Sequence, residues 1–108
     1  MASISMSKVD GWVGPAWVLR AIASGMQKFG SFPSLRESFE AVEEGVQYLD
    51  LTELPEEEAK ELRRVAPLIV MDAKKAGPQS LSDPKFYPGY IDALVEFEQS
   101  ALSKARNT

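Results

Sequence analysis

The chain has 108 residues, a formal net charge of −4, and neither histidine nor cysteine. This length is typical of a single domain with one hydrophobic core, and 44% hydrophobic and 26% charged residues is an ordinary globular composition. The two missing residue types exclude disulfide bonds, thiolate metal sites, cysteine nucleophiles and any reaction that needs an imidazole base. We therefore treat residues 1–108 as one domain.

The first part of the chain carries few signs of regular structure. Residues 1–10 are mostly small and polar, and we expect them to be flexible. The apolar stretch that starts at Trp12 resembles an export signal only superficially, because Asp10 precedes it and Arg20 interrupts it. Apolar runs such as residues 67–71 are far shorter than the roughly 20 residues that span a bilayer. These features favour a cytoplasmic protein without a membrane segment.

The next two segments have the pattern of helices. Residues 16–29 carry apolar side chains at a 3.6-residue period, which predicts an amphipathic helix ending at Gly30. Ser34 and Glu37 have the spacing of a capping box and predict the start of a second helix. The end of this helix stays open, because residues 46–51 suit either more helix or a short extended segment.

Residues 55–76 predict a third helix, which opens at Pro55 with three glutamates in its first turn and stops at Gly77. Pro67 lies in its interior, where proline removes a backbone hydrogen bond, so we expect a kink or a break there. The alternative is a shorter helix followed by a buried strand at residues 68–71.

A loop with three prolines follows at residues 77–88, and a last helix is expected from about residue 88 or 90 to residue 105. Together these segments predict an all-α fold. We expect a single-domain bundle of four to five helices around one core.

Acidic residues are concentrated in residues 36–61, which contain ten acidic and two basic side chains, a net charge of −8. The rest of the chain carries +4. Such a block creates a negative field that repels nucleic acid and attracts a basic surface. Either these acids only coat the solvated sides of two helices, or they form a docking face for a cationic partner. In the second case Glu40, Glu44, Glu57 and Glu58 are candidate partner-binding residues.

Two groups of aromatic residues flank turns in the chain. Trp12 and Trp17 bracket a Gly-Pro turn, and each is either a core residue or, where exposed, a candidate partner contact. Phe86, Tyr87 and Tyr90 lie where the proline-rich loop meets the last helix. These rings either cover the core or form a rigid aromatic patch. We take Trp12, Tyr87 and Tyr90 as further candidate partner-binding residues.

The segment Tyr87-Pro88-Gly89-Tyr90, followed by Leu94 and by Glu98-Gln99, resembles a stretch of certain small all-helical immunity proteins. Those proteins neutralise toxins that are delivered by bacterial type VI secretion. The stretch lies near the N-terminus in those proteins and near the C-terminus here. The resemblance implies a small helical protein that neutralises a toxin.

The sequence thus favours a protein-binding module with an acidic surface, and an immunity or antitoxin-like inhibitor of another protein is its sharpest form. We expect no enzyme activity, no metal, no cofactor and no nucleic-acid binding. One alternative is a small-ligand or regulatory domain with an apolar pocket lined by Trp17, Met26, Tyr87 and Tyr90. Another alternative is a structural subunit that forms homo-oligomers through its helices.

Overall fold

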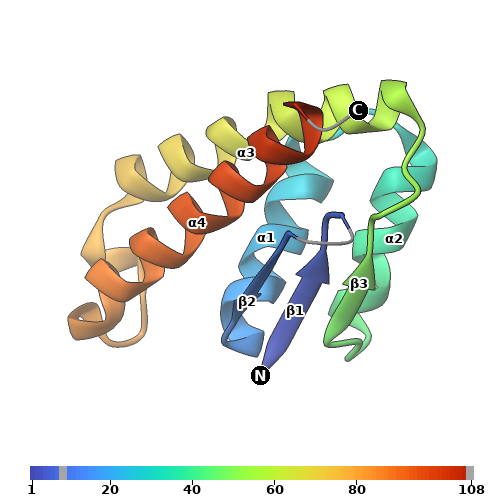
Figure 1. Ribbon diagram of the computed structural model, residues 1–108. Helices are drawn as coiled ribbons and strands as arrows, with labels where there is room; N and C mark the ends of the chain where they lie inside the picture. Colours follow the sequence, from blue (N-terminus) through green and yellow to red (C-terminus); the bar gives the residue numbers. More distant parts are fainter. Residues whose placement is uncertain (8–9, 107–108) are drawn as a thin grey trace.

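A computed structural model describes residues 1–7 and 10–106, and it combines helices with a β-sheet (Figure 1). The elements in chain order are β1 (Ala2–Ser5), β2 (Gly11–Gly14), α1 (Ala16–Phe29), α2 (Pro33–Glu43), β3 (Tyr48–Asp50), α3 (Glu56–Ala76), the short 3-10 turns η1 (Pro78–Ser80) and η2 (Pro84–Phe86), and α4 (Tyr87–Arg106). The expectation of an all-α bundle is therefore wrong. Helices dominate the described residues, but a three-stranded mixed sheet packs against them.

The first two strands arise from a short alternating sequence. In residues 2–7, alanine, isoleucine and methionine alternate with serine, and the three apolar side chains are buried while the serines are half-buried. A period of two is that of a strand with one face on a core. In β2 the same alternation buries Trp12 and leaves Val13 exposed.

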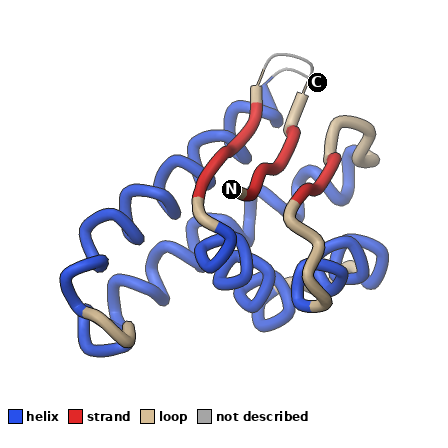
Figure 2. The backbone as a smooth tube through the Cα atoms, turned by 90° about the horizontal axis from the view of Figure 1, so that it is seen from below, coloured by secondary structure: helices blue, strands red, loops and turns tan. Residues whose placement is uncertain are grey.

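The sheet has the order β2-β1-β3, so β1 is its central strand (Figure 2). It pairs antiparallel with β2, where Ile4 lies opposite Trp12, and parallel with β3, where Ile4 lies opposite Leu49. Residues 1–10, which we expected to be flexible, thus include the strand that joins both halves of the sheet. Residues 8 and 9 lie outside the described residues.

The helices bury one face of this sheet. In Figure 1, α1 and α2 lie behind the strands, while α3 and α4 run side by side as a long helical hairpin. The core contains the inward side chains of the sheet together with those of all four helices. Trp12 closes it toward α4, because its indole N–H donates a 2.9 Å hydrogen bond to the carbonyl oxygen of Ala93.

The helices expected at residues 16–29 and 55–76 are confirmed, and α3 continues through Pro67 without a break. Residues 68–71 are part of this helix, so the alternative of a buried strand there is wrong. The segment after α2 does form a strand, β3, which settles the choice that the sequence left open. None of the described helices is both long enough and apolar enough to cross a membrane.

The start of α2 differs from the expected capping box. The helix begins at Pro33 with Phe32 as its N-cap residue, and no side chain caps it. The hydroxyl of Ser34 instead donates a hydrogen bond to the carboxylate of Glu58 in α3. Ser34 therefore links two helices, a role that local spacing does not reveal.

Candidate functional site: an acidic ridge and an aromatic groove

Acidic side chains line the outer side of α2. This helix turns Leu35, Phe39 and Val42 into the core. At about 100° per residue, Glu37 and Glu40 fall on the opposite side of the helix, and Glu44 is its C-cap residue. All three are exposed, so their carboxylates project into solvent along the helix and at its end.

The first turn of α3 adds further acidic side chains beside the start of α2. Glu57 is exposed and Glu58 is half-buried, and the hydrogen bond from Ser34 to Glu58 places that turn beside the start of α2. We call Glu37, Glu40, Glu44, Glu57 and Glu58 the acidic ridge. Of the predicted acidic residues, Glu40 and Glu44 thus lie toward the end of α2, and Glu57 and Glu58 lie in the turn beside its start.

One member of the acidic block lies elsewhere. Glu61 is only 5% exposed, and it accepts hydrogen bonds from the Ser31 hydroxyl (2.5 Å) and from Nε of Arg64 (2.7 Å). Burial alone would raise the pKa of Glu61, but the hydrogen bond from Ser31 and the hydrogen bond and charge of Arg64 outweigh it, so the pKa is lowered. Arg64 also donates to the carbonyl oxygen of Phe29 at the end of α1 (2.8 Å). Glu61 therefore ties helices together and adds nothing to the acidic surface.

Exposed apolar side chains lie next to the acidic ridge. Val46 and Tyr48, which follow α2 directly, are 42% and 54% exposed. Tyr48 stands on the face of the sheet away from the helices, where its hydroxyl lies 3.1 Å from the Ser5 hydroxyl. Val13, which is 60% exposed, lies on the same face. Both Val13 and Tyr48 are paired with Ser3 in the sheet, and side chains of paired residues point to the same face. Tyr48 was not among the predicted contact residues, although its position after the acidic helix is visible in the sequence.

A groove with aromatic walls lies at the other end of α3. Trp17 in α1 stacks on Tyr90 in α4, with ring centroids 5.3 Å apart and an angle of 28° between the rings. Next to Trp17 is a hollow of about 400 Å³ whose other lining residues include Leu81, Asp83 and Phe86. Phe86 is 54% exposed, so it does not cover the core. We call this hollow, together with the stacked rings of Trp17 and Tyr90, the aromatic groove.

The groove extends along one side of α1. Ala21, Gly25 and Phe29 follow Trp17 at intervals of four residues and, with residues of α3, line a second hollow of about 220 Å³. The two hollows share Ser80 and Leu81. Burial, and the negative charge of Asp72, raise the pKa of the Tyr90 hydroxyl on this second hollow.

The structure separates the predicted aromatic candidates. Trp12 is 2% exposed and belongs to the core, so its ring cannot touch a partner at the surface. Tyr90 lines the aromatic groove, and Tyr87 is half-buried at the start of α4. Of the pocket expected between the first and last helices, Trp17 and Tyr90 are present, whereas Met26 is fully buried.

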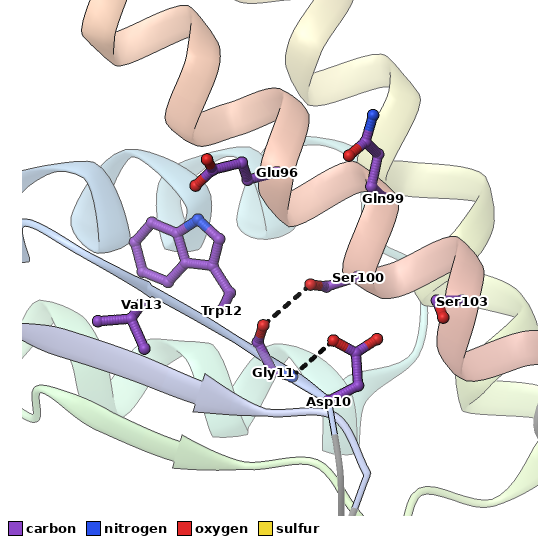
Figure 3. A pocket seen from close by; sticks show the side chains of 8 residues that line it. All are labelled: Asp10, Gly11, Trp12, Val13, Glu96, Gln99, Ser100 and Ser103. Carbon is purple, nitrogen blue, oxygen red and sulfur yellow. Dashed lines mark hydrogen bonds between the residues drawn. The ribbon is translucent and has the colours of Figure 1, made fainter.

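A third hollow, of about 360 Å³, lies between β2 and α4 (Figure 3). Its floor includes the backbone of Gly11, whose carbonyl oxygen accepts a 3.1 Å hydrogen bond from the Ser100 hydroxyl. Figure 3 shows the carboxylates of Asp10 and Glu96 at opposite ends of this hollow. Among the residues that the structure describes, no three acidic side chains come together to hold a metal ion.

Comparison with protein families, with characterised proteins and with solved structures finds no match for this chain.

Proposed function

We propose that this chain is a protein-binding module that recognises a basic partner through the acidic ridge. The observation that carries the proposal is the set of exposed carboxylates of Glu37, Glu40 and Glu44 along α2 and at its end, with the first turn of α3 beside its start. Several carboxylates on neighbouring elements create a directional field that speeds the encounter with a positively charged surface.

The apolar side chains beside the ridge would slow the dissociation of a bound partner, which charges alone do not. Charged residues at the rim of an interface mainly raise the association rate, whereas buried aromatic residues mainly slow dissociation. Tyr48 and Val46 lie next to Glu44 and are both more than 40% exposed. We therefore assign Tyr48 as the aromatic contact of this interface. A second copy of the chain would bring the same negative charge, so the ridge disfavours self-association through this surface.

The sharpest form of the proposal is an inhibitor that covers the functional surface of a toxic or otherwise harmful partner. The acidic ridge of such an inhibitor would face the basic surface with which the partner holds its own substrate. This form also agrees with the resemblance of residues 87–99 to immunity proteins.

The test uses two charge-reversal variants with the same geometry. Glu40→Lys/Glu44→Lys changes two exposed residues one turn apart on the acidic ridge. Asp92→Lys/Glu96→Lys makes the same change one turn apart on exposed positions of α4 and serves as the control. The wild-type chain is used to capture partners from cells that contain it, and the association and dissociation rates of each captured protein are measured at 50 and 300 mM salt.

The expected result is a basic partner whose association with the ridge variant is at least tenfold slower at low salt, while the α4 variant behaves as wild type. Tyr48→Ala should instead accelerate dissociation. Addition of the wild-type chain should suppress the partner's activity. Equal association rates for the wild-type chain, the ridge variant and the α4 variant would refute the electrostatic proposal. Association rates that do not depend on salt would refute it as well.

A further inference from the structure

The aromatic groove contains two aspartates, and each pairs with a lysine whose ammonium group also lies over a phenylalanine ring. Asp83 and Phe86 line the larger hollow, and Lys85 Nζ lies 3.5 Å from Asp83 Oδ2 and 5.3 Å from the centre of the Phe86 ring. Asp72 and Phe29 line the smaller hollow, and Lys28 Nζ lies 3.2 Å from Asp72 Oδ1 and 5.2 Å from the centre of the Phe29 ring. The same combination of carboxylate, ammonium and aromatic ring therefore occurs twice in one groove.

This combination shows which chemistry the groove attracts. The face of an aromatic ring carries partial negative charge and attracts a cation, and a carboxylate beside it adds a direct ion pair. Lys85 is 74% exposed at its side chain and does not line the hollow, whereas its contacts Asp83 and Phe86 do. An exposed ion pair of this kind contributes little to stability, and a competing cation can displace it.

We propose that the aromatic groove binds a small organic ammonium compound with an apolar body. The ammonium group of the ligand replaces that of Lys85 at Asp83, and its apolar body lies against Trp17, Leu81 and Phe86. The hydroxyl groups of Ser80 and Ser82 line the same hollow and can accept a hydrogen bond from an N–H of the ligand.

The size of the hollow agrees with a small ligand. Its volume of about 400 Å³ lies at the lower end of the range for small-molecule sites, and the adjoining hollow extends it along α1. The site is independent of the acidic ridge. Because α3 has 21 residues and rises about 1.5 Å per residue, its first turn and the loop after its last residue are about 30 Å apart. The acidic ridge and the aromatic groove thus lie at opposite ends of α3, whose course Figure 1 shows.

The test uses three probes that share a phenyl ring and differ in charge: phenethylammonium, 2-phenylethanol and 3-phenylpropionate. Binding to the ¹⁵N-labelled full chain is followed by NMR through the indole N–H signals of the two tryptophans. The Trp17 signal should shift in a saturable way with phenethylammonium, whereas the signal of the buried Trp12 should stay in place. The ammonium probe should bind at least tenfold more tightly than either of the other two probes.

Three variants assign the binding to the groove. Asp83→Asn should weaken phenethylammonium about tenfold, and the amide oxygen can still accept the backbone hydrogen bond that Asp83 accepts from Lys85. Lys85→Ala should tighten binding severalfold, because it removes the competing ammonium group. Lys75→Ala removes the same charge from an exposed position near the end of α3 and should leave the affinity unchanged.

The proposal is overturned if the alcohol or the carboxylate binds as tightly as the ammonium probe. It is equally overturned if the Trp17 signal does not respond to phenethylammonium, or if Lys85→Ala weakens binding. These outcomes leave the proposed function of the acidic ridge untouched, because none of the variants alters that surface.

Discussion

Glu61→Gln is the most direct test of how the acidic block divides between structure and surface. The substitution keeps the shape of the side chain but removes the charge that Ser31 and Arg64 stabilise. A hydrogen bond to a charged group contributes about 1.5–3 kcal/mol, against about 0.5–1.5 kcal/mol for a neutral one. Weakening two such bonds should therefore lower the free energy of unfolding by about 2 kcal/mol.

The measurement is urea unfolding at pH 7, supported by the melting temperature, which should fall by on the order of 10 °C for a domain of this size. Glu57→Gln is the matched control, because it removes the same charge from an exposed position on the same helix. That change should stay within about 0.5 kcal/mol of wild type.

The dependence of stability on pH tests whether the charge of Glu61 stabilises the folded chain. The pKa of Glu61 is lower in the folded chain than in the unfolded chain, so its charge contributes fully above the unfolded pKa of about 4.3. That contribution is lost as the pH falls through the lower folded pKa. The difference in stability between wild type and Glu61→Gln should therefore be constant near pH 7 and shrink below about pH 4. A difference that does not depend on pH, or a Glu61→Gln chain as stable as Glu57→Gln, would refute the reasoning.

Three further substitutions test the packing by urea unfolding. Gly25→Ala adds a good helix former, but its Cβ would lie 2.6 Å from Cγ1 of Ile69. We therefore expect the free energy of unfolding to fall by about 1 kcal/mol, and a rise would show that α1 and α3 separate easily. Gly77→Ala should cost about 1–3 kcal/mol, because φ of +77° with ψ of 178° is open to glycine almost alone, and an unchanged midpoint would contradict this. Pro67→Ala should raise stability by about 2 kcal/mol, since alanine supplies the N–H that the carbonyl of Arg63 lacks, and no gain would mean that proline costs little there.

The helices could be predicted because their signals are local. The apolar period of residues 16–29, the glutamates after Pro55 and the stop at Gly77 all depend on neighbours within a few residues. The sheet depends on partners far apart in the chain, since β1 pairs with a strand that begins at Tyr48. Serine also does not favour strands, so the short alternation in residues 2–7 was predicted to be part of a flexible polar segment.

The candidate surfaces divide in the same way. The outward side of α2 follows from the positions of Leu35 and Phe39, so Glu40 and Glu44 were predictable as exposed residues. Which tryptophan is buried was not predictable, because the choice depends on the carbonyl of Ala93 in the last helix. The burial of Glu61 likewise depends on Ser31, thirty residues earlier in the chain.

The hydrogen bond from Trp12 to Ala93 spans 81 residues, and this has a consequence for synthesis on the ribosome. The helix that covers the indole ring is translated only after α1, α2, β3 and α3. Until that helix emerges, the nascent polypeptide must keep a large apolar ring away from other unfinished chains. Because folding depends on such a distant contact, we expect it to be slower than is usual for a largely helical protein. Chains truncated by a stop codon before residue 87 should aggregate, because they lack the helix that covers Trp12.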